Sequence, residues 1–375
     1  MRCYKPSSGK LYAATKWLPF SEYKAVTTNV SSFWSAHANQ KSHNIVAIWL
    51  MVMAGLVAIM VVIGGITRLT GSGLSMVEWR PLMGTLPPLS DTEWSRVYAL
   101  YKQSPEYDKI NFGMDMAGFK LIFFWEYLHR LWGRLLGIAF AVPLIWFAAK
   151  QMIPAGYGRR LIILLVLGGS QGVIGWWMVK SGLSQDATVS QYRLATHLGM
   201  ALFIFSLLIW VALDLRDGQS QSPTGHGLGS LVMVAVTILA GALVAGMDAG
   251  LLYNEYPLMG DGLIPVEYGD EGWRDAFENP ASAQFHHRWL AAITFITVLA
   301  LALRARIMPA LQLRAYMVLA AISAQFILGI FTLLNGVPVW LGGMHQAGAV
   351  VLLGCVLWLL HGNGRQQSPA GNHLA

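Results

Sequence analysis

The sequence predicts an all-α polytopic membrane protein whose eight transmembrane helices form two tandem four-helix bundles. Three observations carry this prediction. Only 12% of the 375 residues are charged and 55% are hydrophobic, whereas a soluble domain usually carries about 25% charged residues. Eight apolar runs are long enough to cross ~30 Å of hydrocarbon. Short motifs recur in the same order in the two halves of the chain.

Each of the eight apolar runs must be helical, because lipid offers no hydrogen-bond partners to an exposed backbone. For the second run, a start several residues later is the alternative. We place the spans near 45–66, 121–149, 160–180, 193–213, 228–248, 285–303, 311–333 and 339–361.

The charges of the connecting segments predict the orientation, because cytoplasmic loops collect Lys and Arg. The two tails and three of the loops hold fourteen Lys and Arg residues against three acidic residues, and we assign them to the cytoplasm: 1–44, 150–160, 214–227, 304–314 and 362–375. The two long loops, 67–120 and 249–284, are then extracytoplasmic. The net charge of +7 therefore reflects membrane topology, and we expect no binding of nucleic acid.

The N-terminal tail holds six basic residues and one acidic residue, without the apolar core of a signal peptide. We interpret it as a cytoplasmic tail in preference to a mitochondrial transit peptide, since only one of the six basic residues is Arg. The two cysteines, Cys3 and Cys355, lie in this tail and in the last span. No CxxC motif is present, so we expect no disulfide chemistry.

An internal repeat divides the chain into two units with four spans each. EYLHR (126–130) matches QFHHR (284–288), and ATHLGMA (195–201) matches GMHQAGA (343–349). QGVIGWWMVKSGL (171–183) also matches QFILGIFTLLNGV (325–337). Chance similarity between apolar segments is the alternative, but the matches fall in order on corresponding spans. The predicted units are a tail (1–44), an N-terminal half (45–213), a linker (214–227), a C-terminal half (228–361) and a second tail (362–375).

Each unit has four spans, so both units have the same membrane orientation. An axis along the membrane normal should therefore relate them. The repeat singles out four histidines, one near the start of each even-numbered span: His129, His197, His287 and His345. All four of these spans run from outside to inside, which places the imidazoles in the outer leaflet at similar depth. Ionisable groups within a membrane are costly and usually functional.

Two facing imidazoles in each half, without a cluster of Cys or carboxylates, favour an iron porphyrin held from both faces. Zinc is the competing metal, but it usually takes three or four protein ligands. The spacing is also compatible with a proton relay or transport function, and with a purely structural function of the histidines.

The halves differ at one chemically important position. Glu126 stands three residues before His129, on the same helix face, whereas Gln284 occupies the matching position before His287. Glu126 either handles protons and stabilises positive charge beside a bound ring, or it pairs with Arg130 at the membrane edge. The asymmetry suggests that the N-terminal site reacts and the C-terminal site carries electrons.

Three arginines are candidates for contacts with haem propionates or with the ligands. Arg130 and Arg288 each follow a site histidine, and Arg68 stands at the start of the first outer loop. Guanidinium groups form charge-assisted hydrogen bonds with carboxylates. Anchoring of the helix start at the interface is the alternative for Arg130 and Arg288.

These motifs, together with GGITRLTGSGLSMVEWRPLMG (64–84), resemble those of the haem A synthase (Cox15/CtaA) family over roughly residues 44–362. The resemblance implies oxidation of the C8 methyl group of haem O to the formyl group of haem A, through a hydroxymethyl intermediate and an aldehyde hydrate. The outer loops contain no cysteine pair, so the chain resembles the branch typical of α-proteobacteria and mitochondria. This excludes a thiol relay for electron delivery.

The resemblance also assigns the site residues. It implies that His287 and His345 hold a resident haem b, that His129 and His197 flank the iron of the substrate haem O, and that Glu126 is catalytic. It implies haem A for cytochrome oxidase as the product, and membrane lipid, a haem O synthase (protohaem farnesyltransferase) and an unidentified electron donor or acceptor as partners. A homo-oligomer is left open.

We expect a multi-pass protein of the bacterial inner membrane, rather than of the mitochondrial inner membrane, with both termini cytoplasmic. Two other functions compete with haem A synthesis. A di-haem cytochrome-b-like quinol oxidoreductase would place its haems towards opposite membrane faces, whereas these histidines lie towards one face. A haem transporter would bind at the midplane through broken helices, and no paired Gly/Pro breaks occur within the spans.

Overall fold

The computed structural model describes residues 40–78, 86–183, 187–220, 223–269 and 272–366. The end of the 64–84 motif and Cys3 lie outside the described residues.

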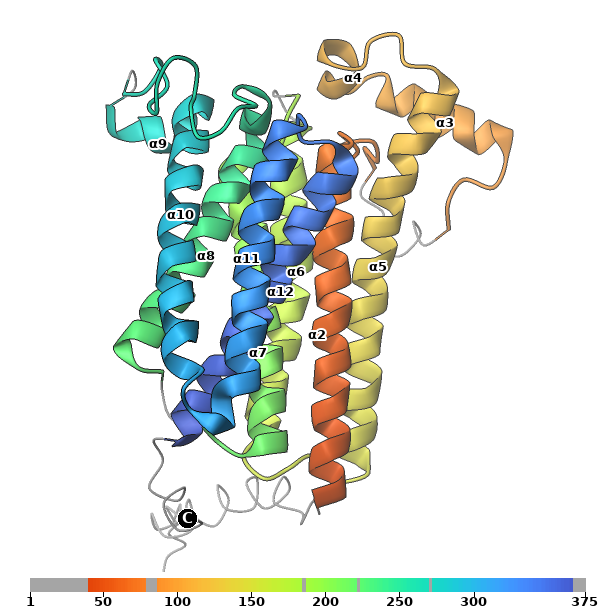
Figure 1. Cartoon of the computed structure of the whole chain (residues 1–375). Helices are drawn as coiled ribbons and strands as arrows, with labels where there is room; N and C mark the ends of the chain where they lie inside the picture. The colour runs from red at the N-terminus through yellow and green to blue at the C-terminus, as the bar shows by residue number, and fades with distance from the viewer. Residues whose placement is uncertain (1–39, 79–85, 184–186, 221–222, 270–271, 367–375) are drawn as a thin grey trace, which may run out of the picture.

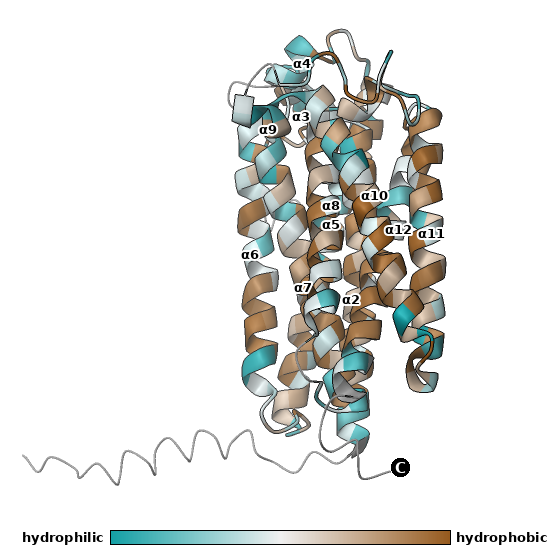
Figure 2. Ribbon diagram, turned by 60° about the vertical axis from the view of Figure 1, so that its left-hand side comes forward, coloured by the Kyte–Doolittle hydropathy of each residue, from teal (hydrophilic) through white to brown (hydrophobic). Residues whose placement is uncertain are grey.

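Eight long helices run side by side and confirm the eight predicted spans (Figure 1). The described residues contain no β-strand. Hydrophobic residues make up much of the helix shafts and hydrophilic residues are frequent towards the two ends of the bundle, as expected of helices in contact with lipid (Figure 2). The helices are α2 (Gln40–Leu69), α5 (Met116–Ala149), α6 (Gly158–Gly182), α7 (Gln191–Asp217), α8 (Gly225–Gly246), α10 (Pro280–Ala305), α11 (Gln312–Leu334) and α12 (Val339–Gln366).

Short helices from the two long loops cover one end of the bundle, which we term the cap end (Figure 1). The first loop forms α3 (Asp91–Tyr101) and α4 (Pro105–Lys109). The second forms the short helices η2 (Ala249–Leu251), η3 (Gly272–Arg274) and α9 (Asp275–Glu278). A further turn, η4 (Pro309–Leu311), precedes α11 at the other end.

Helix α5 begins at Met116, five residues before its predicted start. This extension packs against α3, which together with α4 we term the first cap. Phe119 on the extension stacks on Tyr101 of α3, with ring centroids 5.1 Å apart. Phe123 meets Trp94 edge to face at 5.1 Å. The extension is thus held by aromatic packing against α3, outside the apolar length that the sequence suggested for this span.

The eight spans differ in how far they are buried within the bundle. α7 and α12 are the most buried spans and α6 is the least buried. α2 packs on α12, and α7 packs on α8, to a similar extent. These two equivalent contacts join the halves and are consistent with the predicted axis between the repeats. Among consecutive helices, α5 and α6 pack much less closely than their counterparts α10 and α11.

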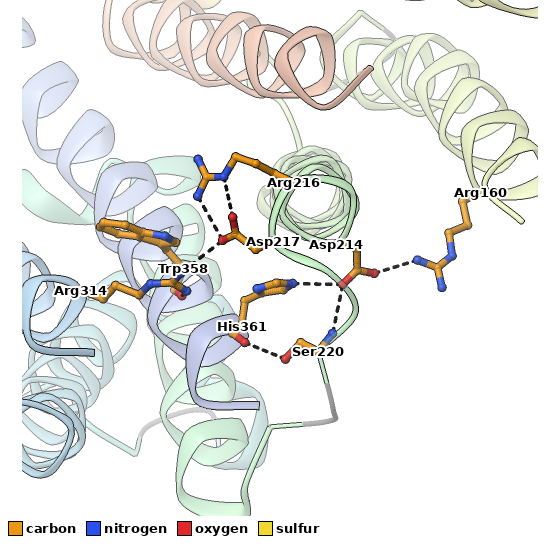
Figure 3. Close-up of polar contacts among 8 residues, drawn as sticks. All are labelled: Arg160, Asp214, Arg216, Asp217, Ser220, Arg314, Trp358 and His361. Atoms are coloured by element: carbon orange, nitrogen blue, oxygen red, sulfur yellow. Dashed lines mark hydrogen bonds and ion pairs between the residues drawn. The ribbon is translucent and has the colours of Figure 1, made fainter. Parts of the chain in front are cut away.

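A cluster of charged side chains ties the halves together at the end opposite the caps (Figure 3). Asp214 near the end of α7 lies 3.0 Å from Nε2 of His361 on α12 and forms a 2.8 Å ion pair with Arg160 of α6. Three residues further, Asp217 pairs with Arg314 of α11 at 3.3 Å. The side chains of Asp214 and His361 are only 5% and 0% exposed. A buried charge is tolerated only with a partner. These contacts, which we term the opposite-end cluster, therefore link α6 and α7 of the N-terminal half with α11 and α12 of the C-terminal half.

Candidate functional site

The structure brings the four histidines together in two pairs, one in each half. His129 on α5 and His197 on α7 lie within electrostatic range of each other, as do His287 on α10 and His345 on α12. Within the described residues, α5 shares no extensive contact with α7, nor does α10 with α12. The closure of each four-helix unit therefore brings its two imidazoles together. Their binding of iron stays a prediction.

Each imidazole contacts a glycine of the helix that precedes it in the chain. These glycines stand five to seven residues before the cap end of their helices, which is about 8–11 Å at the usual rise of 1.5 Å per residue. The four imidazoles therefore lie at similar depth towards the cap end, as the sequence predicted. The contacting pairs are Gly64–His129, Gly175–His197, Gly241–His287 and Gly329–His345.

The ring nitrogens of the C-terminal pair have nearby polar partners. Nδ1 of His287 lies 3.1 Å from the carbonyl oxygen of Thr237. A carbonyl oxygen only accepts, so Nδ1 carries the proton and Nε2 keeps its lone pair for a metal. The side-chain amide of Gln325 lies 3.2 Å from Nδ1 of His345 and donates to the carbonyl of the same residue at 2.9 Å.

The N-terminal pair is less tightly held. Gln171, which matches Gln325 in the repeat, donates to the carbonyl of His197 at 3.3 Å. Nδ1 of His197 is buried and has no partner among the described residues. The His129 ring likewise has no hydrogen bond to any residue that the structure describes. Within the described residues, this half therefore leaves both of its imidazoles without a partner at Nδ1.

The donor set fits haem iron better than zinc. No three His, Cys, Asp or Glu side chains gather within the described residues in a geometry that could hold a metal ion. Structural and catalytic zinc sites take three or four protein ligands, whereas a six-coordinate haem takes two imidazoles.

Glu126 is 3% exposed and lies under the first outer loop. One carboxylate oxygen accepts hydrogen bonds of 2.7 Å from the Ser75 hydroxyl and the Met76 backbone amide. The other oxygen forms an ion pair with Arg130, which also donates to the Met76 carbonyl at 3.0 Å. The carboxylate is thus held in one position, next to His129 on the same helix.

The matching residues of the C-terminal half contact the second outer loop in the same way. Gln284 donates to the carbonyl of Tyr253 at 3.0 Å. Arg288 donates to the carbonyls of Tyr253, Glu255 and Leu258 at 2.8–3.0 Å. Arg130 and Arg288 therefore share a visible function, which is to bind the backbone of the loop above them. Contact of either with a propionate stays a prediction.

Arg68 connects the two halves at the cap end. It forms a 2.8 Å ion pair with Asp248, in the loop after α8, and donates to the carbonyl of Gly246 at 3.2 Å. Its side chain remains 23% exposed. The predicted contact with the N-terminal site stays a prediction, but these bonds explain why a cation stands at the end of α2.

Two cavities open beside Arg130 in the N-terminal half. The larger, of about 370 Å³, lies under α3 and includes Phe123 and Arg96. The smaller, of about 80 Å³, lies between α5 and α6 and includes Trp176 and Lys180. Both are bordered by Met76, Val77 and Arg130. The cavity between the loosely packed helices α5 and α6 therefore reaches Arg130, the partner of Glu126.

Sequence reasoning missed a second buried carboxyl group near this site. Glu106 of α4 is 5% exposed and accepts a 3.1 Å hydrogen bond from the Tyr101 hydroxyl. The pKa of Glu106 is raised to about 7, mainly by burial; the hydrogen bond from Tyr101 opposes this shift and the negative charge of nearby Glu126 adds to it. The residue stands in a short loop helix without a repeat partner, so no pattern marked it.

Comparison with known proteins agrees with this geometry. The family model described as cytochrome oxidase assembly protein, COX15-CtaA, matches residues 47–357. A protein of Paramagnetospirillum magneticum named heme A synthase is 44% identical over 353 residues, which cover 91% of this chain and 100% of the relative. The proteins of the same name from Rhodospirillum centenum and Caulobacter sp. are 47% and 46% identical, and cover 84% and 82% of this chain and 87% and 93% of their own length. The chain belongs to the COX15-CtaA family of cytochrome oxidase assembly proteins.

Proposed function

We propose that this chain is a haem A synthase, which oxidises the C8 methyl group of haem O to a formyl group in the membrane. The observation that carries the proposal is the pair of imidazoles in each half, with a fixed carboxylate beside only one of them. Relatives named heme A synthase align with nearly the whole chain, so no part of the site lies outside the compared region.

The C-terminal half is proposed to hold a resident haem b between His287 and His345. When bound, haem b supplies a redox-active iron for electron transfer. The Thr237 carbonyl accepts the Nδ1–H of His287, which leaves the lone pair on Nε2 for the iron. The close packing of α10 with α11 suits a cofactor that stays in place.

The N-terminal half is proposed to bind haem O between His129 and His197. Haem O carries a farnesyl tail and two propionates, so it needs an apolar access route with a cationic mouth. The loose α5–α6 seam, with Lys180 and Arg130 beside its cavity, meets both requirements. Arg130 would bind a propionate while it keeps its bond to the loop.

Glu126 is proposed to act electrostatically on the substrate. Its position is set by Ser75, Met76 and Arg130 before substrate arrives, so no reorganisation is needed as positive charge develops on the ring. As a carboxylate one helical turn from His129, it would also accept a proton from the hydroxylated methyl group. Gln284 cannot serve either function, which agrees with chemistry in the N-terminal half alone.

The cellular setting is part of the same proposal. We place the protein in a bacterial inner membrane with both termini cytoplasmic, and the cap end outside. A haem O synthase would deliver the membrane-soluble substrate, and a separate redox partner would exchange electrons with haem b. The product, haem A, would pass to cytochrome oxidase.

Pigment extraction from the purified protein tests this function. Chromatography of the extract should resolve haem b together with traces of haem O or haem A. Two equivalents of haem b together with a quinone would instead identify a di-haem quinol oxidoreductase. Protein that is folded and free of pigment would favour a transporter.

A further inference from the structure

We infer that four glycines, Gly64, Gly175, Gly241 and Gly329, are the positioning residues of the four site imidazoles, and that the C-terminal two hold their rings more strictly. The inference concerns how the chain orients its own side chains. It relies on the proposed function for the identity of the group that these side chains bind.

Each glycine leaves the space that its imidazole occupies. An ideal Cβ on Gly241 would lie 2.9 Å from Cε1 of His287, and one on Gly329 would lie 2.8 Å from Cε1 of His345. Carbon atoms in contact prefer 3.5–4.0 Å, so any side chain at these positions would displace the ring. The bare backbones of α8 and α11 at these glycines therefore leave room for the imidazole of the next transmembrane helix. We term each glycine position that faces a site imidazole a seat.

Glycines also face the imidazoles of the N-terminal half, with slightly more room and, at Gly64, with the Nε2–Cδ2 edge of the ring in place of Cε1. A Cβ on Gly64 would lie 3.2 Å from Nε2 of His129, and one on Gly175 would lie 3.1 Å from Cε1 of His197. Gly175 and Gly329 occupy matching positions in the repeated segments 171–183 and 325–337. Gly64 and Gly241 each stand five residues before the end of their helices. All four seats therefore follow the repeat.

Other glycines of these helices do not face an imidazole. An added Cβ would lie within 2.6 Å of a Gln or Leu side chain at Gly65 of α2, Gly182 of α6, and Gly227 and Gly246 of α8, whereas several others face open space. An added Cβ would meet nothing within 4 Å at Gly55 of α2, at Gly168 and Gly172 of α6, or at Gly229 of α8. These positions provide matched controls, because a substitution there changes helix propensity by the same amount without touching a ring.

At Gly241 the seat also determines which ring nitrogen is free. The Thr237 carbonyl lies one helical turn before Gly241, and it accepts the Nδ1–H of His287 at 3.1 Å. A ring that lies against the bare Gly241 backbone reaches this carbonyl with its Nδ1–H, which leaves the lone pair on Nε2. A Cβ on Gly241 would push the ring off both contacts.

The difference between the halves matches their proposed functions. The C-terminal seats are tighter, and the Nδ1–H of His287 has a carbonyl acceptor at 3.1 Å. The N-terminal seats are looser and Nδ1 of His197 is unpartnered within the described residues. Fixed rings suit a cofactor that remains bound, whereas adjustable rings suit a haem that must enter and leave.

The test compares Gly241→Ala and Gly329→Ala with the control Gly229→Ala. The readouts are haem b per polypeptide, the low-spin optical and electron paramagnetic resonance spectra, and the midpoint potential. Disturbed support of a metal ligand typically weakens binding by roughly ten- to a hundred-fold. We expect both seat variants to lose most low-spin haem b and the control to match the wild-type protein. A wild-type spectrum, potential and haem content in both seat variants would overturn the inference.

A compensating variant separates ring positioning from general packing. If Gly241→Ala does not fold, Gly241→Ala combined with His287→Gly should fold, because the clashing ring is gone, and free imidazole should restore a low-spin spectrum. Failure of the double variant to fold would show that Gly241 packs against something else, and would also overturn the inference. Wild-type protein without any haem b would instead refute the proposed cofactor, a result distinct from normal haem binding in the glycine variants.

Gly64→Ala and Gly175→Ala, with Gly55→Ala and Gly168→Ala as controls, extend the test to the other half. Their haem b content and spectrum should be unchanged, because they touch the other pair of rings. Binding of added haem O, followed by its own optical change, should weaken in the two seat variants alone. Loss of haem b from these variants, or unaltered haem O binding, would contradict the assignment of their seats.

Discussion

The carboxylate of Glu126 accepts a 2.7 Å hydrogen bond from the backbone amide of Met76, so the proposed catalytic group is also an anchor for the first outer loop. At the matching position, the side-chain amide of Gln284 donates to the backbone carbonyl of Tyr253 and so holds the second loop. Both halves therefore anchor an outer loop through this position, but only the N-terminal half has a negative charge there.

Glu126→Gln should abolish most haem A formation while the fold and haem b remain. Loss of one preorganised electrostatic contact typically costs ~3–4 kcal/mol of barrier, or roughly a hundred- to a thousand-fold in rate. A haem extract resolved by chromatography into haems B, O and A and the hydroxymethyl intermediate measures this effect.

Gln284→Glu is the matched control, and it should leave haem A output largely unchanged while it shifts the haem b potential through added charge. Limited proteolysis of the first outer loop separates chemistry from anchoring in Glu126→Gln. Normal haem A output with a loosened loop would reduce Glu126 to a structural partner of Arg130.

His287→Ala and His345→Ala should each remove the low-spin spectrum of haem b, because a six-coordinate iron loses an axial ligand. Optical and electron paramagnetic resonance spectroscopy of purified protein provide the measurement. His43→Ala, which lies near the start of α2 and outside the repeated pattern, should have the wild-type spectrum. Full retention of the spectrum in either site variant would refute the ligand assignment.

The loop between α8 and α10 should be extracytoplasmic, because its acidic residues contrast with the basic loops at the opposite end. Ser282 lies in the first turn of α10 and is fully buried, so it is unsuitable for labelling, whereas Val266 in the loop is 86% exposed. In a variant that lacks Cys3 and Cys355, Val266→Cys should react with an impermeant thiol reagent in spheroplasts. Labelling only after lysis would invert the topology and place the haem sites in the cytoplasmic leaflet.

Packing of the first cap should weaken as the pH rises through about 7. Burial raises the pKa of Glu106 from 4.5 to about 7, so its stabilising effect is complete below about 4.5 and is lost as the folded-state carboxyl ionises. The shift corresponds to roughly 3 kcal/mol at high pH.

Hydrogen exchange of the α3 and α4 amides measures this change between pH 5.5 and 8.5. Glu106→Gln removes the ionisation, so the cap should keep its low-pH protection across the range. Equal pH dependence in the variant and the wild-type protein would exclude Glu106 as the cause.

Asp214→Leu should destabilise the protein by about 3–5 kcal/mol, because it leaves the partners of a buried charge unpaired. Asp214 binds both His361 and Arg160 in the opposite-end cluster. Thermal unfolding in detergent, followed by circular dichroism, should show a clear loss of stability with the haem spectrum intact up to the transition. Arg216→Ala, whose side chain is 50% exposed, should change stability by only about 0–1 kcal/mol. An unchanged midpoint in Asp214→Leu would show that the cluster does not join the halves.

The sequence alone determined the number of spans, their approximate limits and the four histidines. Hydropathy marks a span because lipid requires an unbroken apolar helix, which is a local property of the chain. The repeat then made His129, His197, His287 and His345 stand out, since one comparison aligned two independent copies. Hydropathy does not mark the end of a helix that continues beyond its apolar run. The start of α5 therefore lies five residues before the predicted start of the span.

Only the tertiary structure decided what each side chain touches. Asp214 and His361 are 147 positions apart, and neither hydropathy nor spacing pairs them. Glu106 becomes buried because α4 folds back over α5, and Gly241 supports His287 because α8 turns one particular face towards α10. Most side chains on all faces of these spans are apolar, so hydropathy alone does not identify the partner of each residue on a neighbouring helix. That choice depends on packing between distant segments, and it sets the positions of the imidazoles and of the carboxylate beside them.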